Sequence, residues 1–392
     1  MSESAAVGIG SAPPAYLDAA SSEPLHPAAR ESLLAALDAG YADPRRLHHP
    51  ARNARLLLDN ARAVVAECLQ VGPEEVTFTA SGTEAVHRGL LGLAAGATGA
   101  RGPVVLPEVE HAAVRHAAEW WSRWGSRSRA PEEGQPMLVG VDQLGRVDIA
   151  ALAEAVRAGQ PAAVAVQSAN HEVGTLQPVE EAAALARDSG AGLFVDACAS
   201  MGRLPLPRGW DALAGSAHKW GGPAGVGILL VRRGARWATP FPDDDRADHR
   251  AVGYENVPAA LAAAAALQAV VAEREETGRR QHAMIDRIRS AAAAIDDVDV
   301  VGDPDLRLPH LATFSVLYVN GEQLVTELDR RGFSVASGSA CTASTLEPSH
   351  VLAAMGALTH GNVRVSLTRE ATDAQVEAFC AVLPDVVAEL RR

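Results

Sequence analysis

Short runs of β-branched and apolar residues alternate with longer runs rich in alanine and leucine over the first two thirds of the chain. The runs that we predict to be buried strands are Glu75–Thr79, Val104–Leu106, Ala163–Gln167 and Gly192–Asp196. Stretches such as Ile149–Ala158 and Pro178–Ser189 are predicted to be helices between them. This alternation is typical of an α/β fold, in which right-handed crossovers build a mostly parallel sheet covered on both faces.

The pattern changes near residue 255. A long helical stretch, Ala259–Arg289, is followed by separated strand-like runs at Ala312–Tyr318 and Val363–Leu367. A chain of 392 residues exceeds what a single core usually supports. We therefore predict a flexible amino-terminal extension over residues 1–15, a large domain over residues 16–255 and a smaller α+β domain over residues 256–392.

Charge and hydropathy exclude several classes of partner. The chain has 35 Lys and Arg against 48 Asp and Glu, a net charge of −13, which argues against direct binding to nucleic acid or to an anionic membrane. No run reaches the roughly 20 apolar residues of a membrane span, since Leu261–Ala272 is interrupted by Gln268. The first residues lack the pattern of a signal peptide. We expect a cytoplasmic protein without a membrane partner.

The cysteines are few and far apart. They stand at Cys68, Cys198, Cys341 and Cys380. This spacing forms neither a cluster of metal ligands nor a disulfide framework, which fits a reducing compartment. We expect no metal site.

Polar residues follow the predicted strands at four places, where open α/β sheets bind ligands. The run Thr77–Glu84 leads from a strand through a turn of small residues into a helix, whose free amides, with Gly82 and the Thr83 hydroxyl, could hold a phosphate. His111 stands just beyond the second strand and Asp196 ends the fourth. Each of these features also has an ordinary explanation, as a helix cap, a surface histidine or a capping carboxylate.

The fourth place is the run Ser216–Lys219, which is followed by the glycine-rich segment Gly221–Gly227. Glycines allow close backbone approach around a lysine that would otherwise be a surface charge. Together the four places suit one ligand with a phosphate, an aromatic ring, a basic ring nitrogen and an aldehyde. Pyridoxal phosphate has all four, and a carboxylate opposite its ring nitrogen makes the ring an electron sink.

Several motifs of the chain resemble those of a known family. The run Ser337–Leu352, which contains Cys341, resembles the catalytic loop of class V aminotransferase-fold cysteine desulfurases of the iron–sulfur-cluster-assembly branch. Tyr16–Asp18, Ala169–Gly174 and Ser216–Lys219 agree with that resemblance, which extends from Tyr16 to the carboxyl end. It implies the pyridoxal-phosphate-dependent transferase fold, similar to that of aspartate aminotransferase.

The resemblance also implies roles for individual residues. Lys219 matches the lysine that binds the cofactor aldehyde and moves the substrate α-proton, and His111 matches the histidine stacked on the ring. Asp196 matches the partner of the ring nitrogen, Asn170 the contact of the ring oxygen and substrate, and Arg364 the clamp on the substrate carboxylate. The implied phosphate cradle consists of Gly82, Thr83, Ser216 and His218.

The implied reaction converts L-cysteine to L-alanine and leaves a persulfide on Cys341, which is passed to a sulfur-accepting protein. A free cysteine is often only a structural thiol. The small and polar neighbours Gly338, Ser339, Thr342 and Ser344 are unlike a core, which favours the catalytic role.

The sequence departs from the family pattern at three positions. Ala199 stands where a glutamine normally bonds the ring oxygen, and Val86-His87 replace a polar pair after the phosphate turn. Tyr254 stands where a threonine normally reaches the phosphate of the other subunit. The family resemblance implies a homodimer, in which the Tyr254 hydroxyl would take the threonine's place.

Other functions remain open from the sequence. One is a different pyridoxal phosphate enzyme, such as a selenocysteine or C–S lyase or an aminotransferase, which needs no cysteine-bearing loop. Another is a weakly active scaffold that mainly binds a sulfur-accepting protein. The sequence names neither the acceptor nor its pathway, which could be cluster assembly, nucleic-acid thiolation or a specialised metabolite.

Overall fold

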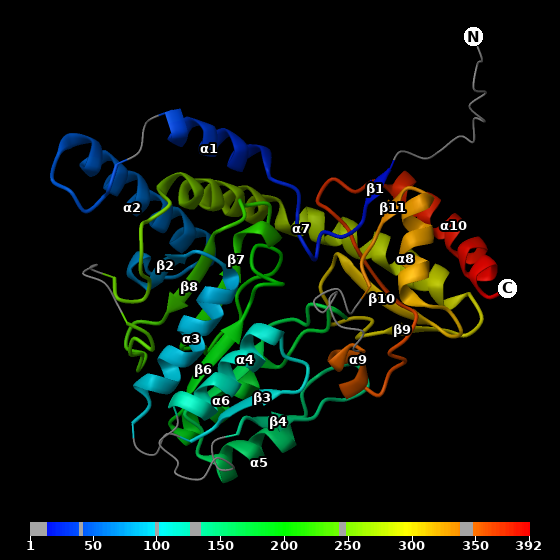
Figure 1. Cartoon of the computed structure of the whole chain (residues 1–392), viewed down its shortest axis with the longest axis horizontal. Helices are drawn as coiled ribbons and strands as arrows, with labels where there is room; N and C mark the ends of the chain where they lie inside the picture. The colour runs from blue at the N-terminus through cyan, green and yellow to red at the C-terminus, as the bar shows by residue number, and fades with distance from the viewer. Residues whose placement is uncertain (1–13, 39–41, 99–101, 126–134, 243–247, 338–347) are drawn as a thin grey trace.

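A seven-stranded sheet lies at the centre of the larger part of the molecule (Figure 1). The computed structural model describes residues 14–38, 42–98, 102–125, 135–242, 248–337 and 348–392. The sheet has the order β2-β8-β7-β6-β5-β3-β4. Its strands are β2 (Val76–Thr79), β3 (Val104–Pro107), β4 (Met137–Val139), β5 (Ala163–Gln167), β6 (Gly192–Asp196), β7 (Ala212–Ser216) and β8 (Gly227–Val231). Only β8 runs against its neighbours, so the prediction of a mostly parallel sheet is confirmed.

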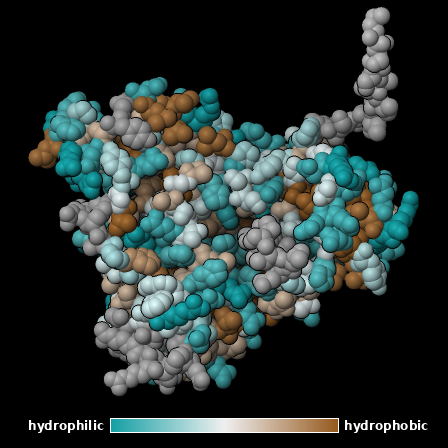
Figure 2. All heavy atoms as spheres, viewed as in Figure 1, coloured by the Kyte–Doolittle hydropathy of each residue, from teal (hydrophilic) through white to brown (hydrophobic). Residues whose placement is uncertain are grey.

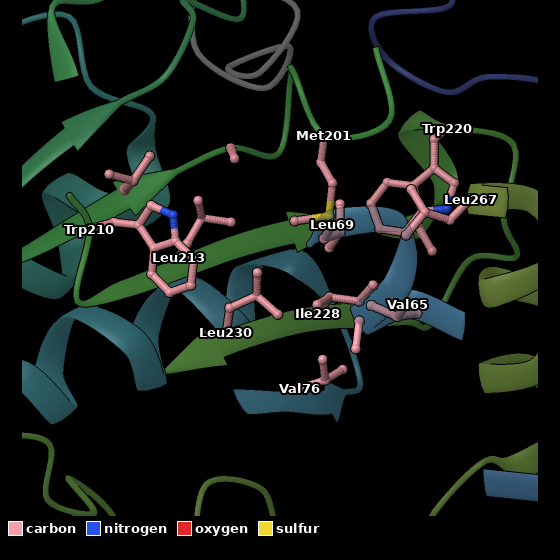
Figure 3. Close-up of a cluster of buried hydrophobic side chains, with 14 of the residues drawn as sticks. Val65, Leu69, Val76, Met201, Trp210, Leu213, Trp220, Ile228, Leu230 and Leu267 are labelled. Atoms are coloured by element: carbon pink, nitrogen blue, oxygen red, sulfur yellow. The ribbon is translucent and has the colours of Figure 1, made fainter. Parts of the chain in front are cut away.

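Both faces of the sheet are covered, as the continuous apolar strands require. In β6, Leu193 and Val195 belong to one apolar core, whereas Phe194 between them belongs to the core on the opposite face. Helices α3 (Gly82–Gly96) and α4 (Ala112–Trp120) cover the face of Phe194. Helices α2 (His49–Leu69), α5 (Ile149–Gly159) and α6 (Val179–Ser189) cover the other face, whose packing around Trp210 and Trp220 is drawn in Figure 3.

The smaller part is built on a three-stranded antiparallel sheet of order β12-β10-β9. Its elements are β9 (Val298–Val301), β10 (Leu311–Val316), α8 (Gly321–Arg330), β11 (Phe333–Ser334), α9 (His350–Ala354), β12 (Asn362–Ser366) and α10 (Asp373–Leu390). The predicted strand Ala312–Tyr318 ends earlier, at Val316, because the chain turns at Tyr318, whose φ is +64°. The smaller α+β unit that the sequence predicts is present.

Two segments cross between the parts. Helix α7 (Val257–Ala293) packs on α2 and on α1 (Pro27–Asp38) at its start, where Leu267 lies in the core of the central sheet. Near its end, Ile288 lies in the core of the smaller part. Strand β1 (Ala15–Tyr16) pairs with β11, so the first described residues lie in the smaller part. The domain limits drawn from the sequence stay a prediction, and residues 1–13 lie outside the described residues.

Helix α7 has the length and composition of a membrane-spanning helix. Within the described part of the chain it is the one helix long and apolar enough to cross a membrane by length and composition. Half of its most apolar window is buried in the fold. Its alanines, such as Ala262 and Ala263, are fully buried against neighbouring elements. Core packing therefore accounts for its composition.

Candidate active site

A cavity of about 270 Å³ lies where strands β3, β5, β6 and β7 give way to loops. Side chains from these loops, from the first turn of α3 and from β12 line it. The predicted site residues among them are Gly82, Thr83, His111, Asp196, Ser216, His218, Lys219 and Arg364. Residues far apart in the sequence thus share one hollow, at the edge where α/β sheets bind their ligands.

One end of the cavity is suited to an anion. The first helical amides of α3, at Gly82 and Thr83, have no acceptor within the helix. A Cβ on Gly82 would lie 2.6 Å from the Cβ of Ser216, so only glycine lets the helix start approach β7 this closely. The Ser216 hydroxyl lies 3.1 Å from Nδ1 of His218. Amides, a hydroxyl and an imidazole therefore gather around one point.

Asp196 and His111 face the cavity from neighbouring loops. Asp196 is 7% exposed, and its Oδ1 accepts a hydrogen bond of 2.9 Å from the amide of Cys198. His111 caps α4, and its Nδ1 accepts a bond of 3.1 Å from the amide of Ala113. Burial lowers the pKa of His111, against the opposing effect of Asp196. The imidazole is therefore neutral with its proton on Nε2, a form that can stack on a ring.

Lys219 ends a single helical turn, Ala217–Lys219, directly after β7. It is the only lysine in the chain, beside 34 arginines. Among the described residues its amine has neither a hydrogen-bond nor an ion-pair partner, whereas its carbonyl accepts a bond of 3.3 Å from Arg203. A half-buried, unpartnered amine in a cavity is available for covalent chemistry.

Arg364 brings the smaller part into the cavity. The side chain is 4% exposed, and its NH1 donates to the carbonyl of His171 at 3.0 Å. Its NH2 donates to Asp18 Oδ1 at 3.0 Å and to the Ser21 hydroxyl at 2.6 Å. Its Nε is buried and has no partner among the described residues. The guanidinium is thus held by three partners, and its side chain lines the cavity, where a guanidinium suits a carboxylate.

Two predicted residues, Asn170 and Tyr254, are not among those that line the cavity. Asn170 is fully buried, and its side chain bonds the carbonyl of Val109 and the amides of Glu172 and Val173. Its neighbours Ala169 and His171 line the cavity instead. Tyr254 is 56% exposed, before the start of α7. Cys341 lies outside the described residues.

His171 is a cavity residue that the sequence analysis did not select. It is 6% exposed, and its ring meets that of His111 edge to face, with centroids 4.9 Å apart. Burial and the neighbouring His111 hold its pKa well below the usual range, so it is neutral. It directly follows Asn170 in the run Ala169–Gly174, so its place in that motif could have indicated it.

Glu110 is a second buried carboxyl group behind the cavity. Its Oε1 accepts a bond of 2.6 Å from the amide of Gln167, and Oε2 has no partner among the described residues. Burial, and then the charge of Asp196, raise its pKa well above the ordinary value.

No group of three or more His, Cys, Asp or Glu within the described ranges could hold a metal ion.

An α/β fold whose cavity holds a lysine, a carboxylate and a histidine is typical of pyridoxal phosphate enzymes, and comparison with known proteins identifies the family. The aminotransferase class-V family matches residues 15–379, so the chain belongs to that family.

Individual relatives narrow the comparison. The IscS-like cysteine desulfurase of Mycobacterium tuberculosis is 36% identical over 391 residues, covering 96% of this chain and 97% of that protein. Cysteine desulfurase IscS of Dictyoglomus turgidum is 30% identical, with 96% and 95% covered. Among solved structures, a NifS-like protein has a TM-score of 0.85 at 25% identity, covering 96% of this chain and all of that one. The apo cysteine desulfurase of Thermococcus onnurineus NA1 has a TM-score of 0.81 at 22% identity, with 96% and 95% covered, and supports the fold alone.

Proposed function

We propose that the protein is a pyridoxal-phosphate-dependent cysteine desulfurase. It converts L-cysteine to L-alanine and passes the sulfur, as a persulfide on Cys341, to an accepting protein. The observation that carries the proposal is the single cavity in which Lys219, Asp196 and His111 meet Arg364 from the smaller part. Relatives named cysteine desulfurase, matched over nearly the whole chain, support the same reaction.

The cavity fits the cofactor at each of its functional groups. The amides of Gly82 and Thr83, with Ser216 and His218, would hold the phosphate, and the close approach at Gly82 brings these groups together. Asp196 would pair with the ring nitrogen and His111 would stack on the ring. When bound, pyridoxal phosphate supplies an electron-withdrawing ring that eases loss of the α-proton.

The remaining steps belong to the chain's own groups. Lys219 would hold the cofactor aldehyde covalently and take the proton from the substrate Cα. Once the C–S bond has broken, Cβ would take up the proton that the Cys341 thiol lost, and Lys219 would return a proton to Cα, as L-alanine requires. Arg364, whose side chain lines the cavity, would bind the substrate carboxylate. The assignment of Asn170 to the ring oxygen remains our proposal, although its amide already bonds the backbone. Ala199 lines the cavity and offers only a methyl group there.

Cys341 would complete the sulfur transfer. Its thiolate attacks the substrate sulfur, so an S–S bond forms while the substrate C–S bond breaks, and the electrons of that bond stay with the carbon that becomes alanine Cβ. The products are L-alanine and one persulfide.

The sulfur acceptor and the compartment belong to this proposal as well. Because the sequence motifs resemble the iron–sulfur-cluster-assembly branch, we propose a protein of that assembly as the acceptor. The described cysteines, Cys68, Cys198 and Cys380, are all free thiols, as a reducing cytoplasm would keep them.

We further propose a homodimer. Apolar side chains are exposed on α1, before and on α2, and before α7, and Figure 2 shows hydrophobic residues gathered over α1. The side chains in question are Leu34, Leu37, Leu47, Leu56 and Tyr254. Exposed apolar patches of this kind mark interaction surfaces.

Product analysis tests the reaction. The protein loaded with pyridoxal phosphate is mixed with L-cysteine, and we expect equal amounts of L-alanine and of persulfide, located on Cys341 by mass spectrometry after alkylation. Pyruvate with ammonia would instead indicate a C–S lyase, and a keto acid that needs an amino acceptor would indicate an aminotransferase. A colourless protein without turnover would favour the scaffold.

A further inference from the structure

Helix α9 is docked on two loops that line the cavity. Its cap residue Ser349 donates from its hydroxyl to Oε2 of Glu172 at 2.6 Å, and both side chains are buried. The ring nitrogen Nε2 of His350 lies 3.0 Å from the carbonyl of Glu110, the residue before His111. One contact thus reaches the loop after β5 and the other the loop after β3.

Apolar packing reinforces both hydrogen bonds. Val351 and Leu352 of α9 share a small core with Val109 and Val173. Val109 lies two residues before His111, and Val173 directly follows Glu172. The start of α9 is therefore fixed to the same two loops that place His111 and His171 at the cavity, and Figure 1 shows it between the two parts of the molecule.

Glu172 holds the centre of this arrangement. It is 3% exposed, and its Oε1 lies 3.6 Å from Nε2 of His171. Its backbone is fixed as well, because its carbonyl accepts a bond of 2.6 Å from the Thr313 hydroxyl and its amide donates to Asn170. A buried carboxyl group needs such partners. The hydroxyl of Ser349 supplies the partner of its second oxygen, Oε2.

We propose that Glu172 is a positioning residue for sulfur transfer, which acts by holding Ser349 and with it the carboxyl end of the segment that carries Cys341. The inference rests on the proposed function. Ser349 follows Cys341 by eight residues. At the other end of the segment, Ala336 and Arg364 exchange two backbone hydrogen bonds of 3.2 and 2.7 Å. Both ends are thus bonded to residues that lie at or beside the cavity.

Two reactions of the loaded enzyme separate this role from general stability. Exchange of the α-proton of L-alanine with D₂O needs the cofactor, Lys219 and Arg364 but no sulfur attack. Persulfide formation from L-cysteine needs Cys341 as well. Misplacing a reacting group by about 1 Å can cost about 100-fold in rate. Loss of the Glu172–Ser349 contact should therefore slow only the second reaction.

The decisive variants are Glu172→Leu, which removes the acceptor, and Ser349→Ala, which removes the donor. We expect each to lower the rate of persulfide formation by about 10- to 100-fold and to leave α-proton exchange within about twofold of the wild type. Glu172→Gln keeps an acceptor oxygen and should restore most of the persulfide rate. The matched control is Ser315→Ala, whose buried hydroxyl bonds Leu358 at 2.8 Å away from this contact, and it should change neither rate.

Other results would overturn the proposal. An equal fall of both rates would assign Glu172 a structural role only, and unchanged persulfide formation in Ser349→Ala would show that the contact positions nothing. Should Glu172→Leu fail to fold, Ser349→Ala decides alone. A wild-type enzyme that exchanges the α-proton but never forms a persulfide would overturn the proposed function itself, and this inference with it.

Discussion

At the scale of single residues, Lys219 offers the sharpest test because the chain has no other lysine. Borohydride reduction of the loaded wild type should fix one cofactor to a peptide that contains Lys219. We expect Lys219→Ala to gain no such mass and to lose turnover. The half-buried amine has no partner among the described residues, so the free energy of unfolding should change by less than about 0.5 kcal/mol. A reduced adduct on the variant would disprove the assignment.

Arg364→Lys tests the carboxylate clamp. The guanidinium donates to Asp18, to Ser21 and to the carbonyl of His171. An ammonium group cannot keep these bonds and also present a fork to the substrate. Hydrogen bonds to charged groups are worth about 1.5–3 kcal/mol, so kcat/KM for L-cysteine should fall by at least about tenfold, mainly through KM. An unchanged KM would remove Arg364 from substrate binding.

Most of the residues that line the cavity could be predicted from the sequence, but the orientation of each side chain could not. Lys219, Asp196 and His111 follow strands, and parallel strands end at one edge of a sheet, so their meeting could be predicted. Asn170 and His171 are adjacent in an irregular loop, where no periodicity tells which side chain faces the cavity. The structure buries Asn170 and brings His171 to the wall. The role of Tyr254 depends on a second chain and cannot follow from one sequence.

At the scale of elements, the docking of α9 predicts a pH dependence of stability. Burial raises the pKa of Glu172 from 4.5 to about 7, against the hydrogen bond from Ser349 and the charge of Arg364. The folded state therefore binds this proton more tightly than the unfolded state. The stabilisation is complete below pH 4.5 and is lost as the pH rises through 7, by about 3 kcal/mol in all.

Urea unfolding of wild type and Glu172→Gln at pH 5 and pH 8 measures this effect. We expect the wild type to lose more stability than the variant between the two values, because the amide does not titrate. The comparison cancels Glu110, whose raised pKa acts in the same direction in both proteins. Parallel pH profiles would mean that Glu172 titrates normally.

The elements themselves were predicted unevenly, for physical reasons. Long apolar runs identified Ala163–Gln167 and Gly192–Asp196, which coincide with β5 and β6. The strand predicted from Glu75 begins one residue later, because Pro73–Glu75 forms a helical turn closed by the Glu75 side chain on the amide of Gly72. The two-residue strands β1 and β11 are too short for any pattern and exist only because they pair with each other.

At the scale of the whole molecule, α7 joins two cores that the sequence placed in separate domains. Its first turns share a groove of about 530 Å³ with α1 and α2, lined by Ala36, Leu56 and Val257 among others. Glu255, the neighbour of Tyr254, lines the same groove. The exposed Leu56 and the neighbour of Tyr254 therefore line one groove, which the proposed second copy of the chain would cover.

Leu56→Asp tests that surface. Leu56 is 69% exposed, so the change costs the isolated chain little, whereas an unpaired carboxylate buried in an interface costs several kcal/mol. We expect light scattering to show a dimer for the wild type and a monomer for the variant. A wild type that is monomeric and fully active would contradict the proposed assembly.

The last prediction links this surface to the cavity. If the Tyr254 hydroxyl donates to the cofactor phosphate of the other subunit, Tyr254→Phe keeps the ring, and with it the dimer, but removes a donor to a charged group. Such a bond is worth about 1.5–3 kcal/mol, so equilibrium dialysis should show pyridoxal phosphate bound about 10- to 100-fold more weakly.

Tyr318→Phe is the control, because Tyr318 is 79% exposed in the turn after β10 and lies far along the chain from the groove. The cofactor affinity of Leu56→Asp should fall as well, since a monomer cannot supply the hydroxyl to a partner. Wild-type affinity in Tyr254→Phe together with weak binding in Leu56→Asp would show that the interface supports the site through another residue.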